Sequence, residues 1–326
     1  MIAVTAGKQQ VGKDVIKSLS EKGYGLKVLV SSEKQLQDFK NLFGHLSIEF
    51  ILGNLLDVTI LDELIDGVET VVHLDEMISF NPSEKNEMYR HNVQGTANVV
   101  NVALHHNVQQ IIFLSSVWAM GEKSDQPIYN EEAKWVNVKN AKGYGWSKHL
   151  AEREIWRGVN EGLAATIFNV GYITSNLALD EQMSNILGYF TNKKAFPEGH
   201  LELTEMEDFL AIMLQKIEFA KDSEQYILSN GSVTFKSIIE ELVKLKGDKA
   251  SLTAMNIDDL NQKSRFKILY NLFSSNKFKT PNKLEALMLS DKRKFSCQKL
   301  KSVYDHKFIE KEKSLRNLIN NYRASI

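Results

Sequence analysis

Short runs of β-branched residues alternate with helix-length segments, and this alternation limits the folds open to the chain. Five runs predict buried strands, at 2–5, 28–30, 48–51, 71–74 and 111–114. The segments between them, such as 11–22 and 92–106, are long enough for helices. Repeated strand–helix–strand units favour parallel strands with helices on both faces. The first half therefore predicts an α/β fold with a doubly wound parallel sheet.

The pattern becomes less regular after Gly171. A sixth strand is expected at 165–168, followed by helices at 177–190, 205–219 and 234–245 and a strand at 225–228. A length of 326 residues allows about two domains, or one large domain with an appendage. We expect a smaller, mostly helical C-terminal region after the parallel sheet.

Composition excludes several classes of protein. The net charge is -1, and 43% hydrophobic with 25% charged residues is an ordinary globular mixture, so nothing favours a nucleic-acid partner. A single cysteine, Cys297, rules out a disulfide framework and a cysteine-based zinc site. No apolar stretch approaches the roughly 18 to 20 residues of a membrane span. We expect a cytoplasmic protein.

One segment, 261–301, is strongly basic. It holds eleven Lys or Arg residues against only Glu285 and Asp291. A solvated helical face is the simplest interpretation, because Lys and Arg usually lie outside the core. Apolar residues such as Phe266 and Leu269 alternate with these charges, so binding of an anionic substrate or a membrane surface is the alternative interpretation.

The strongest chemical signal is the pair Tyr144 and Lys148. Residues four apart share one helix face, so the ammonium can lie near the phenol and favour the phenolate. A tyrosine with a pKa near its usual value of about 10 exchanges protons poorly at neutral pH, and a nearby cation corrects this. Ser115 and Ser116 end a predicted parallel strand, where open α/β sheets bind ligands. A hydroxyl there can bind the same substrate oxygen.

Three stretches around these residues resemble the extended short-chain dehydrogenases/reductases, or NAD-dependent epimerase/dehydratases. Residues 92–100 resemble the family's Asn-Val-x-Gly-Thr-x-Asn helix, 113–121 its catalytic-serine strand and 144–152 its Tyr-x-x-x-Lys helix. The segments 101–104, 119–121 and 161–163 resemble the dihydroflavonol-4-reductase-like branch in particular. The resemblance covers nearly the whole chain.

This resemblance implies a Rossmann-type dinucleotide-binding domain over 1–170. The region 171–326 is then mainly substrate-binding, with returns to the first domain around 200–230. Ser116 is expected to orient the substrate oxygen, Tyr144 to exchange a proton with it, and Lys148 to lower the pKa of Tyr144 and hold the nicotinamide ribose. The substrate is expected to be a small molecule with a carbonyl or hydroxyl group that exchanges a hydride with the cofactor.

The resemblance also suggests where the substrate and a second subunit bind. The substrate pocket is expected between the two regions, over the carboxyl ends of the strands. Its specificity should depend chiefly on 171–199 and 256–281. Family members often pair through two helices, which here are 92–107 and 145–161, so we expect a homodimer.

The glycine-rich turn departs from the family pattern. The family begins with Thr-Gly-x-x-Gly-x-x-Gly, whereas this chain has Ala6 and Gln9 in place of the first two glycines and keeps only Gly12. A side chain at position 9 projects toward the expected phosphates, and Lys8 supplies a compensating charge.

Other expected cofactor positions also differ. Asp75 and Glu76 place carboxylates beside the dinucleotide path, Asn54 replaces an aspartate, and Val170 replaces a proline after Asn169. The full set of expected cofactor-binding residues is Ala6, Gly7, Lys8, Gln9, Gln10, Val11, Gly12, Ser31, Asn54, Leu55, Leu74, Asp75, Asn92, Lys148 and Asn169. The cofactor is expected to be NAD or NADP, with NADP favoured, or none if the altered turn no longer binds a dinucleotide.

Three functions follow from these observations. The first is an NAD(P)-dependent oxidoreductase that reduces a ketone or aldehyde. The others are a non-catalytic binding or regulatory relative, and a nucleotide-sugar epimerase or dehydratase. A metal site is not expected, because His73, His91, His105 and His106 show no recognised ligand spacing.

Overall fold

The computed structural model describes residues 1–6, 10–121, 128–135, 143–174, 179–219, 222–248, 251–255 and 278–325. Gly7, Lys8 and Gln9 of the altered turn lie outside these ranges. So does most of the stretch 256–281, including much of the basic segment.

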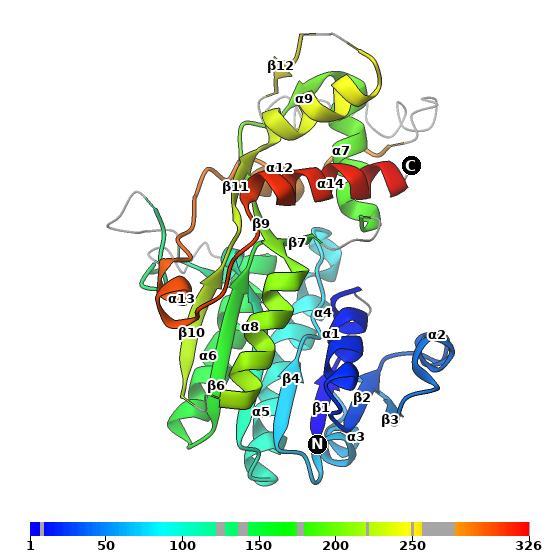
Figure 1. Ribbon diagram of the computed structural model, residues 1–326, viewed down its shortest axis with the longest axis vertical. Helices are drawn as coiled ribbons and strands as arrows, with labels where there is room; N and C mark the ends of the chain where they lie inside the picture. The colour runs from blue at the N-terminus through cyan, green and yellow to red at the C-terminus, as the bar shows by residue number, and fades with distance from the viewer. Residues whose placement is uncertain are drawn as a thin grey trace.

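A seven-stranded parallel sheet forms the centre of the molecule (Figure 1). Its order is β10-β6-β5-β4-β1-β2-β3. The strands are β1 (Ile2–Thr5), β2 (Leu26–Val30), β3 (Ile48–Leu52), β4 (Thr70–His73), β5 (Gln110–Ser116), β6 (Ala164–Val170) and β10 (Glu224–Leu228). Together with its flanking helices, this sheet confirms the predicted Rossmann-type α/β fold.

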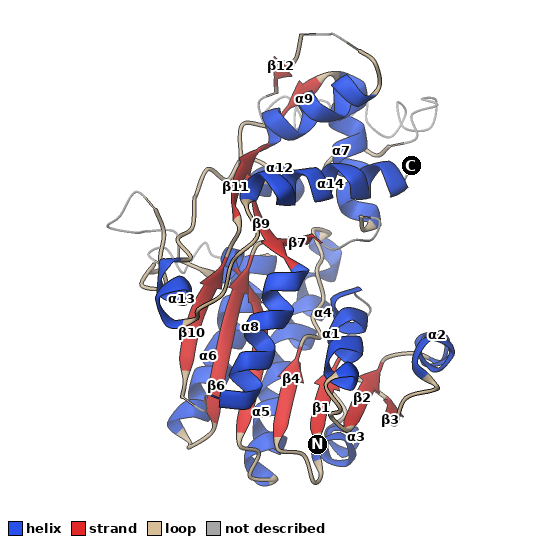
Figure 2. Cartoon of the chain, viewed as in Figure 1, coloured by secondary structure: helices blue, strands red, loops and turns tan. Residues whose placement is uncertain are grey.

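Helices cover both faces of the sheet because side chains alternate along each strand. In β1, Ile2 and Val4 enter one apolar core and Ala3 enters the other. The first core is completed by α1 (Gln10–Glu21), α2 (Glu33–Phe43) and α8 (Met206–Phe219). The second is completed by α3 (Val58–Ile65), α5 (Gly95–His105) and α6 (Tyr144–Asn160). Figure 2 shows these helices in front of and behind the strands.

The helix expected at 92–106 begins in an irregular turn. A 3-10 turn (Pro82–Glu84) and α4 (Lys85–Tyr89) lead into a π-helical turn, Arg90–Gln94, and then into α5. A Cβ on Gly95 would lie 2.8 Å from Leu55 Cβ, so the glycine lets α5 pack against the residues that follow β3.

The remaining chain builds a third apolar core beyond the carboxyl ends of the large sheet. A three-stranded sheet, of order β11-β9-β7, supports it. Its strands are β7 (Tyr172–Thr174), β9 (His200–Glu205) and β11 (Gly231–Thr234), and the covering helices are α7 (Glu181–Lys193), α9 (Phe235–Leu245), α12 (Lys283–Met288) and α14 (Lys311–Ser325). A small pair joins β8 (Ala195–Phe196) to β12 (Thr253–Ala254). The expected helices at 205–219 and 234–245 are present, whereas the three-stranded sheet was not predicted.

Two later segments return to the large sheet. Strand β10 pairs in parallel with β6, as the run at 225–228 predicted, and α13 (Gln298–Val303) buries Leu300 in the first core. Within the described ranges, no helix is long and apolar enough to cross a bilayer.

Candidate active site

The structure brings Ser116, Tyr144 and Lys148 together at the carboxyl end of β5. Ser116 is the last residue of β5, Tyr144 is the first residue of α6, and Lys148 follows one helical turn later. Lys148 Nζ donates to the Leu114 carbonyl at 2.8 Å, which ties α6 to the end of β5. Tyr144 and Ser116 both line a large pocket.

A fourth residue, Glu76, lies between the tyrosine and the lysine. Tyr144 Oη donates to Glu76 Oε2 at 2.8 Å, and Lys148 Nζ lies 2.9 Å from the same oxygen. The Glu76 side chain is only 8% exposed. Glu76 therefore takes the contact with Lys148 that the family resemblance reserves for the nicotinamide ribose.

This contact corrects the expected electrostatics of Tyr144. The pKa of the phenol is raised well above 10, first by burial and then by the negative charge of Glu76. The hydroxyl of Ser116 lowers the pKa by a smaller amount. The prediction that Lys148 lowers this pKa was wrong for this arrangement, because the ammonium is paired with Glu76.

The segment after β4 holds Glu76 in place. The Leu74 and Asp75 amides both contact Thr5 Oγ1, at 3.2 and 3.3 Å. Farther along, the Met77 amide donates to Asn92 Oδ1 at 2.7 Å. Sequence reasoning flagged Glu76 as a carboxylate near the cofactor path but missed its contact with the tyrosine.

Asn92 supports the site from within the protein. Its amide nitrogen donates to the Met77 carbonyl and to Ser147 Oγ, each at 2.9 Å, and the residue is 2% exposed. It therefore joins the segment after β4 to α6. Its side-chain amide is bound within the protein on both sides, and the expected cofactor contact of Asn92 stays a prediction.

A buried polar network lies behind Ser116. Ser115 donates to Glu152 Oε1 at 2.5 Å, and Asn169 Nδ2 donates to Glu152 Oε1 at 2.6 Å and to the Ser116 carbonyl at 2.9 Å. Gln225 Nε2 donates to Asn169 Oδ1 at 2.7 Å. Burial raises the pKa of Glu152 to about 7. Asn169 is completely buried and helps to fix the end of β5, and its expected cofactor contact stays a prediction.

The turn between β1 and α1 keeps one property of a dinucleotide-binding crevice. A Cβ on Gly12 would lie 2.3 Å from the Ala6 carbonyl oxygen, so only glycine lets α1 pack this closely on β1. Gln10 and Val11 line the pocket beside it. This end of the crevice therefore keeps the close helix–strand packing of a dinucleotide-binding turn, whereas at the other end Glu76 contacts Lys148.

The other predicted cofactor positions lie around this crevice with different partners. Ser31 donates from its hydroxyl to Gln35 at 3.1 Å, and Asp75 lies 3.3 Å from His91 Nε2. Asn54 is exposed and accepts from the Leu56 amide at 2.8 Å. Leu55 and Leu74 are buried in the two cores. Leu55 is completely buried, and its expected contact with the cofactor stays a prediction.

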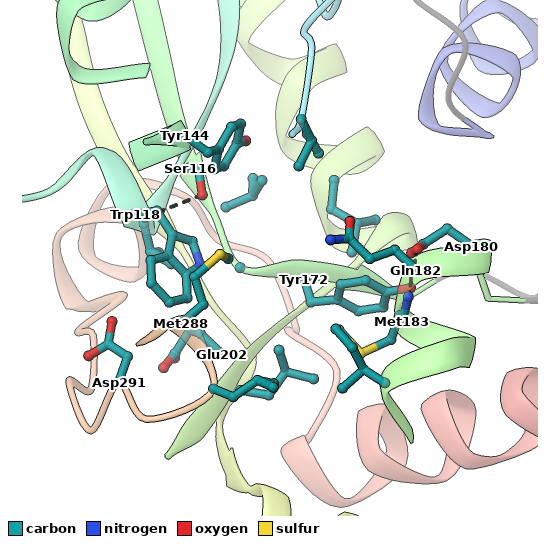
Figure 3. Close-up of a pocket in the computed structure, with 18 of the residues that line it drawn as sticks. Ser116, Trp118, Tyr144, Tyr172, Asp180, Gln182, Met183, Glu202, Met288 and Asp291 are labelled. Carbon is teal, nitrogen blue, oxygen red and sulfur yellow. Dashed lines mark hydrogen bonds between the residues drawn. The ribbon is translucent and has the colours of Figure 1, made fainter. Parts of the chain in front are cut away.

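The pocket has a volume of about 570 Å³ and lies between the large sheet and the third core (Figure 3). Its wall is largely apolar and includes Ile78, Phe80, Trp118, Tyr172, Met183, Phe235, Met288 and Phe295. The expected stretch 171–199 supplies part of this wall. The contribution of 285–295 was missed, because only the charge of that segment was visible in the sequence.

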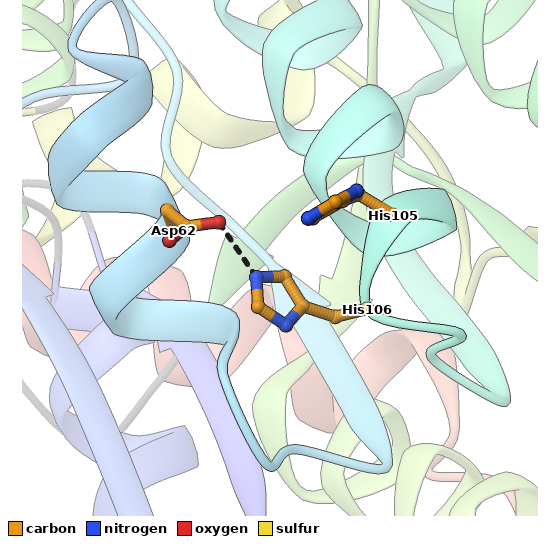
Figure 4. Close-up of side chains that lie close together, drawn as sticks. All are labelled: Asp62, His105 and His106. Atoms are coloured by element: carbon orange, nitrogen blue, oxygen red, sulfur yellow. Dashed lines mark hydrogen bonds and ion pairs between the residues drawn. The ribbon is translucent and has the colours of Figure 1, made fainter.

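Two histidines lie close to Asp62 on the side of the sheet where the strands begin (Figure 4). Ligand atoms of Asp62, His105 and His106 lie within 4.8 Å of one another, where α3 and α5 end. His106 Nε2 is 2.7 Å from Asp62, and its Nδ1 is 3.6 Å from Asp66. These contacts hold His106 between two carboxylates.

His73, another histidine considered as a ligand, lies inside the sheet. Its Nδ1 bonds Thr5 Oγ1 at 2.7 Å and its Nε2 bonds Thr96 Oγ1 at 2.9 Å. Burial lowers the pKa of His73 to about 3. His73 is therefore a neutral core residue.

Comparison with known proteins places these residues in a family. The sequence model of the NAD dependent epimerase/dehydratase family matches residues 2–207. A protein of Synechocystis sp. named "Putative dihydroflavonol 4-reductase" is 25% identical over 251 residues, covering 75% of this chain and 72% of its own. Cinnamoyl-CoA reductase 1 of Petunia hybrida is 26% identical over 263 residues, covering 75% and 77%. The crystal structure of the Bordetella bronchiseptica enzyme WbmH with NAD+ superposes with a TM-score of 0.73 at 14% identity, covering 99% and 98% of the two chains.

Proposed function

The chain belongs to the NAD-dependent epimerase/dehydratase family, and we propose that it is an NAD(P)-dependent oxidoreductase acting on a ketone, an aldehyde or the corresponding alcohol. One observation carries this proposal: Ser116 and Tyr144 line a largely apolar pocket beside buried Lys148. Two relatives that match most of the chain are named as reductases, which supports the same reaction class.

The side chains can divide the chemistry among them. Ser116 Oγ accepts from the Trp118 amide at 3.2 Å, so its own hydrogen is directed elsewhere and can bind a substrate oxygen. Tyr144 can then give a proton to that oxygen, or take one from it. A bound dinucleotide supplies or accepts the hydride. The apolar wall excludes water from the reacting carbonyl.

Release of Glu76 prepares Tyr144 for this role. Two of the causes that raise the pKa of Tyr144 are the charge of Glu76 and its hydrogen bond. When Glu76 withdraws, both causes disappear and Lys148 becomes free to act on the phenol and on a ribose. We propose NADP ahead of NAD, because Ser31, rather than the acid that binds an NAD ribose, follows β2.

The first test is direct titration with NADH and NADPH, followed by nucleotide fluorescence and thermal shift. Micromolar binding of either one supports the proposal and permits a screen of carbonyl substrates. Failure of both to bind at millimolar concentration contradicts it.

A non-catalytic binding or regulatory protein is the second candidate. The Glu76 contacts favour it, because a carboxylate bound to Lys148 opposes a dinucleotide at the same place. Cofactor-dependent turnover of any carbonyl compound would exclude this candidate. For either function, a homodimer through 92–107 and 145–161 remains a proposal that sedimentation velocity can test.

A further inference from the structure

Most charged side chains that line the pocket are acidic. Carboxylates come from five positions, Glu76, Asp180, Glu202, Glu285 and Asp291. Among the described lining residues, Arg293 alone carries a guanidinium or ammonium group. A site for a phosphorylated substrate needs cationic ligands, because phosphate is bound best by charged donors. The described lining of this pocket instead carries mostly acidic groups, which a phosphate group disfavours.

Arg293 itself is already engaged. Its Nε and Nη2 donate to the two oxygens of Asp291 at 2.9 to 3.1 Å and 2.7 Å. Its Nη1 donates to the Met120 and Gly121 carbonyls at 3.1 and 3.3 Å. The planar group also lies 5.7 Å from the Trp118 ring and 5.4 Å from the Phe295 ring. Asp291 thus keeps the guanidinium from serving as an anion ligand.

Protein contacts fix the other carboxylates in the wall. Asp180 caps α7 and accepts from Tyr172 Oη at 2.6 Å. Glu285 accepts from Gln182 Nε2 at 3.1 Å, and Glu202 accepts from Ser229 Oγ. Figure 3 shows Asp180 on one side of the pocket and Glu202 and Asp291 together on the other. An anion that entered the pocket would therefore meet carboxyl groups on both sides.

We propose that the pocket selects an uncharged or cationic carbonyl compound with an apolar body, rejects a phosphorylated one, and owes this selectivity to Asp291. The inference rests on the proposed function, since it concerns the same pocket and names the substrate class. It separates a carbonyl reductase from a nucleotide-sugar epimerase or dehydratase, because a nucleotide-sugar substrate carries a diphosphate. A reductase of unphosphorylated carbonyl compounds fits the wall.

Three aryl ketones of similar shape test the inference. They are 4-ethylacetophenone, which is neutral, 4-acetylbenzylamine, which is cationic, and 4-acetylbenzoate, which is anionic. UDP-glucose serves as the diphosphate probe. Binding to the full chain is measured by calorimetry at low salt, without a dinucleotide, and turnover is followed separately with NADH and NADPH. We expect the neutral and cationic ketones to bind more tightly than the anionic ketone and UDP-glucose, by a factor of about ten at least.

Asp291→Asn gives the sharpest comparison. The variant keeps an oxygen acceptor but releases the charge of Arg293, so affinity for 4-acetylbenzoate should rise about tenfold. Glu198→Gln is the matched control, because Glu198 is exposed and pairs with the neighbouring Lys292 at 2.9 Å. Glu198→Gln should leave the affinities for all the probes unchanged. Asp180→Asn supplies a second variant that removes a pocket charge while keeping a good helix cap.

The outcomes separate the inference from the proposed function. The expected order of binding without any turnover supports the inference and contradicts the reductase proposal. Tighter binding of UDP-glucose or the anionic ketone to the unmodified chain overturns the inference, whatever the turnover. Failure of the neutral and cationic ketones to bind also overturns it. An unchanged preference in both Asp291→Asn and Asp180→Asn removes the assigned role of these carboxylates.

Discussion

Tyr144 Oη donates a hydrogen bond of 2.8 Å to Glu76, a carboxylate that also lies 2.9 Å from Lys148. Two groups expected to act on a substrate and a cofactor are therefore joined by a side chain of the protein itself. Binding of a dinucleotide must compete with this internal contact, and the free energy of the ion pair opposes it.

Glu76→Gln should increase the affinity for NADH or NADPH by about tenfold, because the carboxylate no longer competes for Lys148. The same change leaves buried Lys148 without its charge partner and should lower the free energy of unfolding by about 3 kcal/mol. Nucleotide fluorescence measures the first effect and thermal unfolding the second.

Asp75→Asn is the comparison for this variant. Asp75 also carries a charge after β4 but lies 3.3 Å from His91 rather than beside Lys148. It should improve affinity less than Glu76→Gln does. Equal effects of the two variants would show that general charge, and not the contact with Lys148, controls binding.

Tyr144→Phe should reduce kcat about a hundredfold or more while leaving the far-UV circular dichroism unchanged, because it removes only the proton-donating hydroxyl. NADPH or NADH oxidation with the best carbonyl substrate provides the measurement. Tyr24→Phe, remote from the pocket, is the control. Undiminished turnover in Tyr144→Phe excludes the proposed proton transfer.

The buried Glu152 should make stability depend on pH. Its pKa is about 7 in the folded protein against an ordinary value of 4.5, so the unfolded chain loses this proton first. The stabilising contribution is present below about pH 4.5 and is lost as the pH rises toward 7. Glu152→Gln should therefore gain up to about 3 kcal/mol relative to the unmodified chain between pH 4.5 and 8. Urea unfolding at several pH values gives the difference, and a constant difference contradicts the assignment.

Removal of metal ions should leave turnover unchanged. Asp62, His105 and His106 lie where α3 and α5 end, before the strands that carry the catalytic side chains at their far ends. Turnover before and after dialysis against EDTA measures the effect. A loss that is restored by Zn²⁺ would show that a metal serves the reaction.

The strands of the large sheet could be predicted because each buried run is local in the sequence. The placement of Tyr144 and Lys148 on one face of α6 could be predicted because helical spacing alone determines it. The position of Glu76 could not be predicted, since it depends on contacts that Thr5 and Asn92 make with the segment after β4. The internal hydrogen bonds of Asn92 and Asn169 could not be predicted, because a sequence does not show which amides are bound inside the protein.

The engagement of Arg293 by Asp291 was also beyond sequence reasoning. The basic segment showed an excess of charge, which favoured a solvated face or an anionic ligand. Three-dimensional packing instead brings Arg293 to the Met120 and Gly121 carbonyls, more than 170 positions earlier in the chain.

The C-terminal segment connects the first core of the large sheet to the third core through several such contacts. Leu300 enters the core of the large sheet, Lys299 pairs with Glu224 at 2.6 Å, and His306 pairs with Asp208 at 2.7 Å. A chimaera that exchanged everything after Gly171 for the equivalent part of a relative would also replace pieces of the first core. Recombination between relatives is therefore a poor route to new specificity in this lineage, whereas single substitutions in the pocket wall leave the shared core intact.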